Sequence, residues 1–180
     1  MIMSHKNCIQ LRNAPAGTGR GGYTLIEIVL VLAIIGILMA TVVPTFIHSQ
    51  EGKLLDNAAN QILMTMQTAK WRAADTKLNH RVRFSSSGSL WTYRIERETS
   101  PGTWTLVPGT TLTQISSGFE VTMNLPTSQD AIFQATGFVS NYQSSKNSIT
   151  LISPKLRTLS QPYQRIIRLF AGGSVQCSKT

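Results

Sequence analysis

Residues 21–43 read GGYTLIEIVLVLAIIGILMATVV, an apolar run with a single carboxylate, Glu27, near its start. About 20 apolar residues in a helix, at a rise of about 1.5 Å each, match the hydrocarbon core of a bilayer, which is about 30 Å thick. The run therefore predicts a membrane-spanning helix. A carboxylate at the edge of such a run is costly unless it finds a partner, so we expect Glu27 to have a specific role.

The segment before Gly22 differs from an ordinary secretory signal. It carries Lys6, Arg12 and Arg20, with no acidic residue and no apolar stretch of its own. Because positive charge precedes the apolar run, we expect the N-terminus in the cytoplasm and the rest of the chain outside it. The alternative is a plain signal-anchor helix that is neither cleaved nor assembled, but this leaves Glu27 unexplained.

The order Gly22-Tyr23-Thr24-Leu25-Ile26-Glu27, followed by the apolar helix, resembles the prepilin processing site of type IV pilins and pseudopilins. The resemblance implies that a prepilin peptidase cuts after Gly22 and that Tyr23, the new first residue, is N-methylated. Glu27 would then be the fifth residue, which in this family pairs with the N-terminal amine of a neighbouring subunit. Gly36 and Pro44 fall at the family's helix-softening positions.

The helical pattern continues beyond the apolar run. Apolar residues recur with a 3.6-residue period from about residue 47 to 73, which predicts one helix from about Tyr23 to about Asp75. Its second half is amphipathic and requires a domain packed on one side. We therefore expect four parts: a cleaved leader at 1–22, the membrane half of the helix at 23–46, its amphipathic half at 47–78, and a β-rich periplasmic domain at 79–180.

After Asn79 the apolar residues alternate with period two, which is typical of strands. Residues 81–84 and 90–96 predict a hairpin around the turn 85–88. Further strands are expected at 103–107, 119–123, 131–134, 137–140, 148–152 and 163–170, with a polar loop at 141–147. The predicted fold class is α+β, with the long helix packed on an antiparallel β-sandwich. Its core is expected to contain Leu55, Ile62, Met66, Phe84, Phe133, Ile149, Leu151, Ile166 and Leu169.

The C-terminal part resembles the GspH/FimT family of pseudopilins and minor pilins. The residues that carry this resemblance are Phe133-x-x-x-Gly137, the strand 149–151, the strand 165–169 and the terminal turn Gly172-Gly173-Ser174-Val175. In that family they form a phenylalanine-to-glycine hairpin, a central apolar strand and a glycine turn. The resemblance implies a pilin-like fold of the GspH/FimT type.

No catalytic or metal-binding set is visible in the sequence, so we expect neither an enzyme nor a cofactor. His5, His48 and His80 are isolated along the chain. Cys177 has no neighbouring cysteine or histidine at metal-ligand spacing, and Cys8 lies in the expected leader. After processing, an internal disulfide is therefore excluded.

Nucleic acid is the alternative partner, because the formal net charge is +9 and would still be +6 after loss of the three leader cations. The candidate DNA contacts are Arg81, Arg83, Arg165 and Arg168. Such residues also serve as solvated strand edges that discourage edge-to-edge pairing. In DNA-binding FimT-like minor pilins the implicated basic residues follow the terminal glycine, whereas here Gly173 is followed by Ser174, Val175 and Gln176.

These resemblances imply a structural subunit, a minor pseudopilin of a type II secretion pseudopilus or a minor pilin of a type IV pilus. A FimT-like minor pilin that binds DNA for natural transformation is the alternative. The expected partners are the prepilin peptidase, the inner membrane and other pilins or pseudopilins in a helical filament or tip complex. The expected location is the inner membrane, with one span, a cytoplasmic N-terminus and a periplasmic C-terminal domain.

Overall fold

The structure is a computed structural model that describes residues 22–127 and 129–180, and the side chains of 41–48 lie outside this description. The expected leader, up to residue 21, also lies outside it. The chain divides into two compact units, Met1–Val42 and Val43–Thr180.

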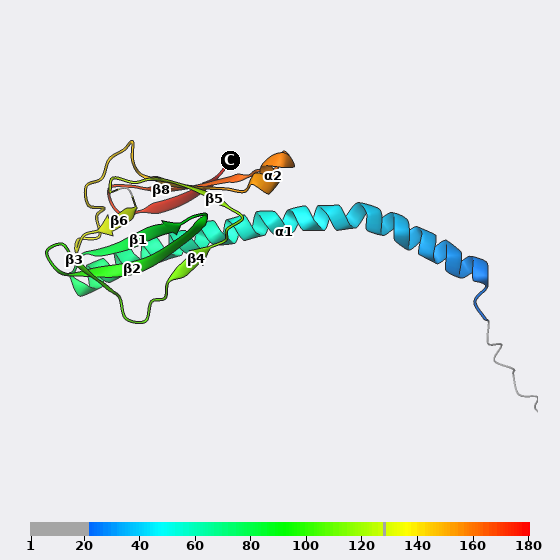
Figure 1. The fold of residues 1–180 in the computed structure, drawn as a ribbon, viewed down its shortest axis with the longest axis horizontal. Helices are drawn as coiled ribbons and strands as arrows, with labels where there is room; N and C mark the ends of the chain where they lie inside the picture. The colour runs from blue at the N-terminus through cyan, green and yellow to red at the C-terminus, as the bar shows by residue number, and fades with distance from the viewer. Residues whose placement is uncertain (1–21, 128) are drawn as a thin grey trace, which may run out of the picture. The chain divides into compact units, whose positions relative to one another are not determined.

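Helix α1 spans Leu25–Thr76 (Figure 1). This confirms the predicted helix. It was expected to begin two residues earlier, at Tyr23, and to end one residue earlier, at Asp75. In the part of the chain that the structure describes, no helix combines the length and the apolar character needed to cross a membrane. The side chains of 41–46, part of the span predicted over 23–46, lie outside the described residues.

In the described part of the second unit, nine strands form two antiparallel sheets. The first sheet contains β1 (His80–Ser87), β2 (Leu90–Ser100), β3 (Thr103–Leu106), β4 (Thr113–Ile115) and β6 (Asp130–Phe133) in the order β3-β2-β1-β6, with β4 also paired to β2. The second contains β5 (Glu120–Asn124), β7 (Ser148–Ile152), β8 (Gln164–Leu169) and β9 (Val175–Lys179) in the order β5-β7-β8-β9. A short helix, α2 (Pro154–Thr158), connects β7 to β8. This arrangement confirms the predicted α+β class.

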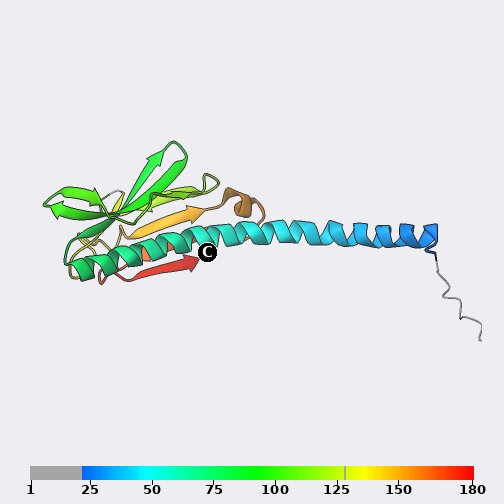
Figure 2. The same ribbon diagram turned by 90° about the horizontal axis from the view of Figure 1, so that it is seen from below.

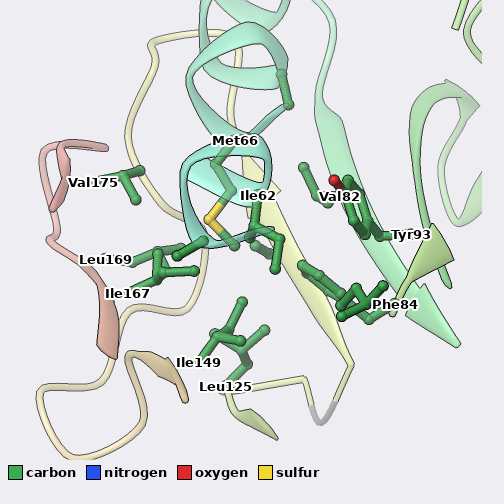
Figure 3. Close-up of a cluster of buried hydrophobic side chains, with 14 of the residues drawn as sticks. Ile62, Met66, Val82, Phe84, Tyr93, Leu125, Ile149, Ile167, Leu169 and Val175 are labelled. Carbon is green, nitrogen blue, oxygen red and sulfur yellow. The ribbon is translucent and has the colours of Figure 1, made fainter. Parts of the chain in front are cut away.

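The C-terminal half of α1 runs alongside both sheets (Figures 1 and 2). Its buried residues recur at spacings of three and four, as expected for one helix face: Leu55, Ala59, Ile62, Met66, Ala69 and Ala73. Figure 3 shows Ile62 and Met66 between side chains of the first sheet, such as Phe84, and side chains of the second, such as Ile167. Burial of each large apolar side chain stabilises the domain by about 1.5–3 kcal/mol.

Eight of the nine predicted core residues are buried, and the prediction for Ile166 is wrong. On β8 the buried positions are Arg165, Ile167 and Leu169, and Ile166 is only partly buried. Successive strand residues point to opposite faces of a sheet, so Ile166 cannot share a face with Leu169, three residues away. The strand period itself therefore required Ile167.

Three elements were not predicted: β4, α2 and β9. Helix α2 has a local signal, because Ser153 caps it by accepting a hydrogen bond from the Leu156 N–H and Pro154 occupies its first turn. The strand predicted at 137–140 is reduced to a single bridge between Phe133 and Val139. The hairpin of β1 and β2 is confirmed, with both strands longer than expected.

Candidate assembly site

The first unit presents a helix surface whose large apolar side chains are exposed among the described residues. Its large apolar side chains are exposed from Tyr23 to Met39, among them Leu25 at 83% and Leu32 at 62%. Leaving apolar surface in water costs about 25 cal/mol per Å². The helix therefore requires an apolar environment, supplied by lipid or by other protein chains.

The polar residues at the start of α1 position Glu27 in the first helical turn. Thr24 precedes the helix, and its Oγ1 atom accepts a hydrogen bond of 3.3 Å from the Glu27 N–H. The Thr24 carbonyl oxygen accepts two more, from the N–H groups of Glu27 and Ile28, at 3.1 and 3.3 Å. Thr24 thus acts as an N-cap, and the carboxylate of Glu27 lies where the helix dipole favours negative charge.

The remaining residues of the predicted processing and assembly site lie on this segment. Gly22 and Tyr23 precede the helix and are exposed. Gly36 lies inside α1, and a Cβ added there would meet nothing within 4 Å beyond the backbone of its own helix. Helix α1 continues through Pro44, whose side chain lies outside the described residues.

Comparison with known proteins bears directly on this segment. Residues 18–43 match the family model described as the prokaryotic N-terminal methylation motif. The N-terminal segment is type IV pilin-like. The match covers the apolar run and Glu27, whereas the second unit lies almost entirely outside it. No curated protein matches the chain.

Among solved structures, the chain is similar to the minor pseudopilin EpsH from the Type 2 Secretion System of Vibrio cholerae. The two share 14% sequence identity, and the similarity covers 69% of this chain and 95% of EpsH, with a TM-score of 0.49. A likeness of this size carries no functional inference by itself.

The structure separates the four candidate DNA contacts into two buried and two exposed arginines. Arg81 is buried on the outer face of the first sheet, where its guanidinium contacts Glu96 at 2.6 Å and Asp130 at 2.9 Å. The ring of Trp104 lies 4.4 Å from the guanidinium carbon and covers it. The guanidinium of Arg81 is therefore already bound by side chains of the same chain. Arg83, two residues along the same strand, is exposed.

Arg165 is also occupied within the chain. Only 2% of its side chain is exposed, and its Nε donates to Asp56 on α1. Its Nη1 donates to the carbonyl oxygens of Pro162 and Gln164. Arg165 thus ties α1 to β8, and of this second pair only Arg168 is exposed. Neither Arg81 with Arg83 nor Arg165 with Arg168 therefore forms an exposed basic cluster.

The carboxylates that hold Arg81 were missed from the sequence, although strand alternation contains the signal. Residues 81 and 83 on β1 and residues 94 and 96 on β2 lie on the same face of the hairpin, and Arg81 pairs directly with Glu96 in the register. Opposite charges that face each other across a hairpin stabilise it. Asp130 had no such signal, because its approach to Arg81 depends on the pairing of β6 with β1.

The two carboxylates have opposite pKa shifts. Burial raises the pKa of Glu96, but the hydrogen bond and charge of Arg81, followed by Arg94, outweigh burial and hold that pKa below the ordinary 4.5. Stability from Glu96 is therefore present above about pH 4.5 and is lost as the pH falls through its lowered pKa. For Asp130, burial outweighs the attraction of Arg81 and Arg83 and raises its pKa above 3.8.

We expect Glu96→Gln to lower the free energy of unfolding by about 3 kcal/mol, because it leaves the buried Arg81 without its main counter-charge. Arg94→Gln is the matched control. Arg94 donates to the same carboxylate at 2.6 Å, but 43% of its side chain is exposed, so a loss of about 0.5 kcal/mol is expected. Denaturant unfolding of the full chain in detergent micelles measures both, and equal losses would contradict this assignment.

Proposed function

We propose that this protein is a minor pseudopilin or minor pilin, a structural subunit of a type II secretion pseudopilus or a type IV pilus. The match of residues 18–43 to the N-terminal methylation motif supports this proposal. The prepilin peptidase would cut between Gly22 and Tyr23 and methylate the new N-terminus. The chain would wait in the inner membrane, with its second unit in the periplasm, before it joins the filament.

The observation that carries the proposal is the exposed apolar helix with one acidic residue at its start. Between residues 25 and 40 the only charged side chain is that of Glu27, and the large apolar side chains there are exposed. Lateral packing of such helices against one another buries this surface. A carboxylate that enters such a packed core loses its hydration and must find a cation, which the N-terminal amine of a neighbouring subunit can supply.

The alternative of DNA reception has less support from the charge distribution. Of its four candidate contacts, Arg81 and Arg165 are buried in ion pairs. The residues after Gly173, Ser174 and Gln176, are exposed but uncharged. Weak binding of duplex DNA at low salt would follow from net charge alone and would not distinguish the two functions.

The experiment that tests the proposal is cross-linking from α1 in cells that contain an active prepilin peptidase. A photoreactive residue at Leu32, which is 62% exposed, should cross-link to other pilin-like chains. The matched control carries the same probe together with Gly22→Ala, which should block processing and therefore assembly. Cross-links of equal yield in both chains, or none to pilin-like proteins, would contradict the proposal.

A further inference from the structure

Two arginines near the buried His80 have an Nε atom without a hydrogen-bond partner among the described residues. The Nε atoms of Arg72, on α1, and Arg97, on β2, are buried and make no hydrogen bond within the described part of the chain. Neither side chain takes part in an ion pair there. Both side chains are partly exposed as a whole, so a solute can approach them from solvent.

The strand register and the helix position place these two arginines on the same side of the first sheet. Arg97 lies directly opposite His80 in the pairing of β1 with β2. Directly opposed residues point to the same face of a sheet, so Arg97 shares the inner face with the buried His80. Arg72 comes from α1, which covers that face, and it directly precedes the buried Ala73.

Among the described residues, no ion pair compensates the positive charge of Arg72 and Arg97. Burial lowers the pKa of His80, the hydrogen bond from its Nδ1 to the Leu78 carbonyl opposes this, and the charges of Arg72 and Arg97 lower it further. Glu98, which follows Arg97 on β2, already accepts hydrogen bonds from Asn79 at 2.7 Å and from the Gly102 N–H at 2.8 Å.

The other buried or half-buried guanidiniums discussed above each contact a carboxylate. Arg81 and Arg94 both contact the carboxylate of Glu96, and Arg165 contacts Asp56, although the buried Nη2 atom of Arg165 also makes no hydrogen bond among the described residues. Buried positive charge normally requires such a counter-charge. Arg72 and Arg97 therefore differ from these arginines in having no carboxylate partner among the described residues, and an acceptor for their Nε groups must come from elsewhere.

We propose that Arg72 and Arg97 form a binding site for a phosphate-type oxyanion. The planar guanidinium fork donates two parallel hydrogen bonds to an oxyanion, and an acceptor oxygen at each fork would satisfy the two unpaired Nε groups. A tetrahedral dianion can offer separate oxygens to two forks at once, whereas a carboxylate offers only two oxygens. The site is independent of the N-terminal processing and assembly proposed above.

Sulfate is the probe, because its charge does not change near neutral pH. The full chain, labelled with ¹⁵N-arginine in zwitterionic detergent micelles, is titrated with sodium sulfate against sodium chloride at equal ionic strength. The Nε–H signals of Arg72 and Arg97, each assigned by its loss in Arg72→Gln or Arg97→Gln, should shift together and saturate with a Kd of about 1 mM. The signal of Arg157, an exposed arginine on α2, should not change.

Each single variant should weaken the response of the remaining arginine by about fivefold or more, whereas Arg157→Gln should leave it unchanged. Arg72→Lys keeps the charge but loses the fork, so it should recover only part of the affinity. Inorganic phosphate should bind like sulfate, and acetate at least fivefold more weakly. Parallel shifts of all arginines, the same response to chloride, or acetate binding as tight as sulfate would overturn the proposal.

A final arm identifies the source of the oxyanion. The titration is repeated in bicelles that contain either phosphatidylglycerol with phosphatidylcholine or phosphatidylcholine alone. An apparent sulfate affinity that falls only in the anionic bicelles indicates competition from a lipid phosphate. An unchanged affinity indicates a soluble phosphate group.

Discussion

Replacement of Glu27 by valine is expected to leave processing and membrane insertion intact but to reduce incorporation into filaments at least about tenfold. Thr24 still caps the helix in the variant, because its hydrogen bonds go to backbone N–H groups. The apolar replacement removes a desolvation cost in the membrane, so residence there should not suffer. The variant lacks the charge proposed to pair with a neighbouring N-terminal amine, and a tenfold loss corresponds to about 1.4 kcal/mol.

Two further variants isolate the role of that charge. Glu27→Gln keeps the shape and hydrogen-bonding capacity but not the charge, so it should fail to assemble in the same way. Glu120→Gln is the matched control, because Glu120 is an exposed carboxylate in the second unit, 3.9 Å from Arg157. Quantification of sheared filaments against membrane-retained protein measures all three. Normal incorporation of the Glu27→Val chain into filaments would contradict the proposed pairing of Glu27 with a neighbouring N-terminal amine.

The second large effect is expected at Gly173, where the terminal glycine turn meets the loop around Gly137. Gly173 has φ of +71°, and a Cβ there would lie 2.1 Å from the Gly137 carbonyl oxygen. Relief of that clash requires the two turns to separate, which would break the hydrogen bond from the Val139 N–H to the Ala171 carbonyl. We expect Gly173→Ala to lower the free energy of unfolding by about 3 kcal/mol or more.

The adjacent glycine supplies the control. Gly172 is exposed, and an added Cβ would meet no atom within 4 Å, so Gly172→Ala should change the free energy of unfolding by at most about 0.5 kcal/mol. Thermal unfolding of the full chain in micelles should show a Tm lower by roughly 10 °C for Gly173→Ala and almost unchanged for Gly172→Ala. Equal values for the two variants would mean that the turns do not interlock as described.

The features that were predictable from the sequence are those with a local signal. The period of apolar residues along α1 gives its length, and alternation about the turn at Gly88 gives the hairpin of β1 and β2. Gly22, Tyr23 and Glu27 also form one short ordered pattern, and the match to the methylation motif covers these residues. Their roles in processing and assembly stay predictions.

Features that depend on distant pairing had no such signal. Arg165 and Asp56 are 109 residues apart, and Arg81 and Asp130 are 49 apart. The sequence therefore predicted Arg81 and Arg165 as candidate contacts to a polyanion, whereas both are neutralised inside the fold. The unpaired Arg72 and Arg97 were missed for the same reason, because their proximity depends on how α1 packs against the first sheet.

The most direct measurement of the central claim is the mass of the N-terminal peptide of protein extracted from membranes. In cells with an active prepilin peptidase, we expect a chain that begins at Tyr23 and carries one methyl group on its amine. In the Gly22→Ala chain, the peptide should instead retain the leader and no methyl group. An intact, unmethylated leader on the unaltered chain, in cells whose peptidase processes other prepilins, would contradict the account.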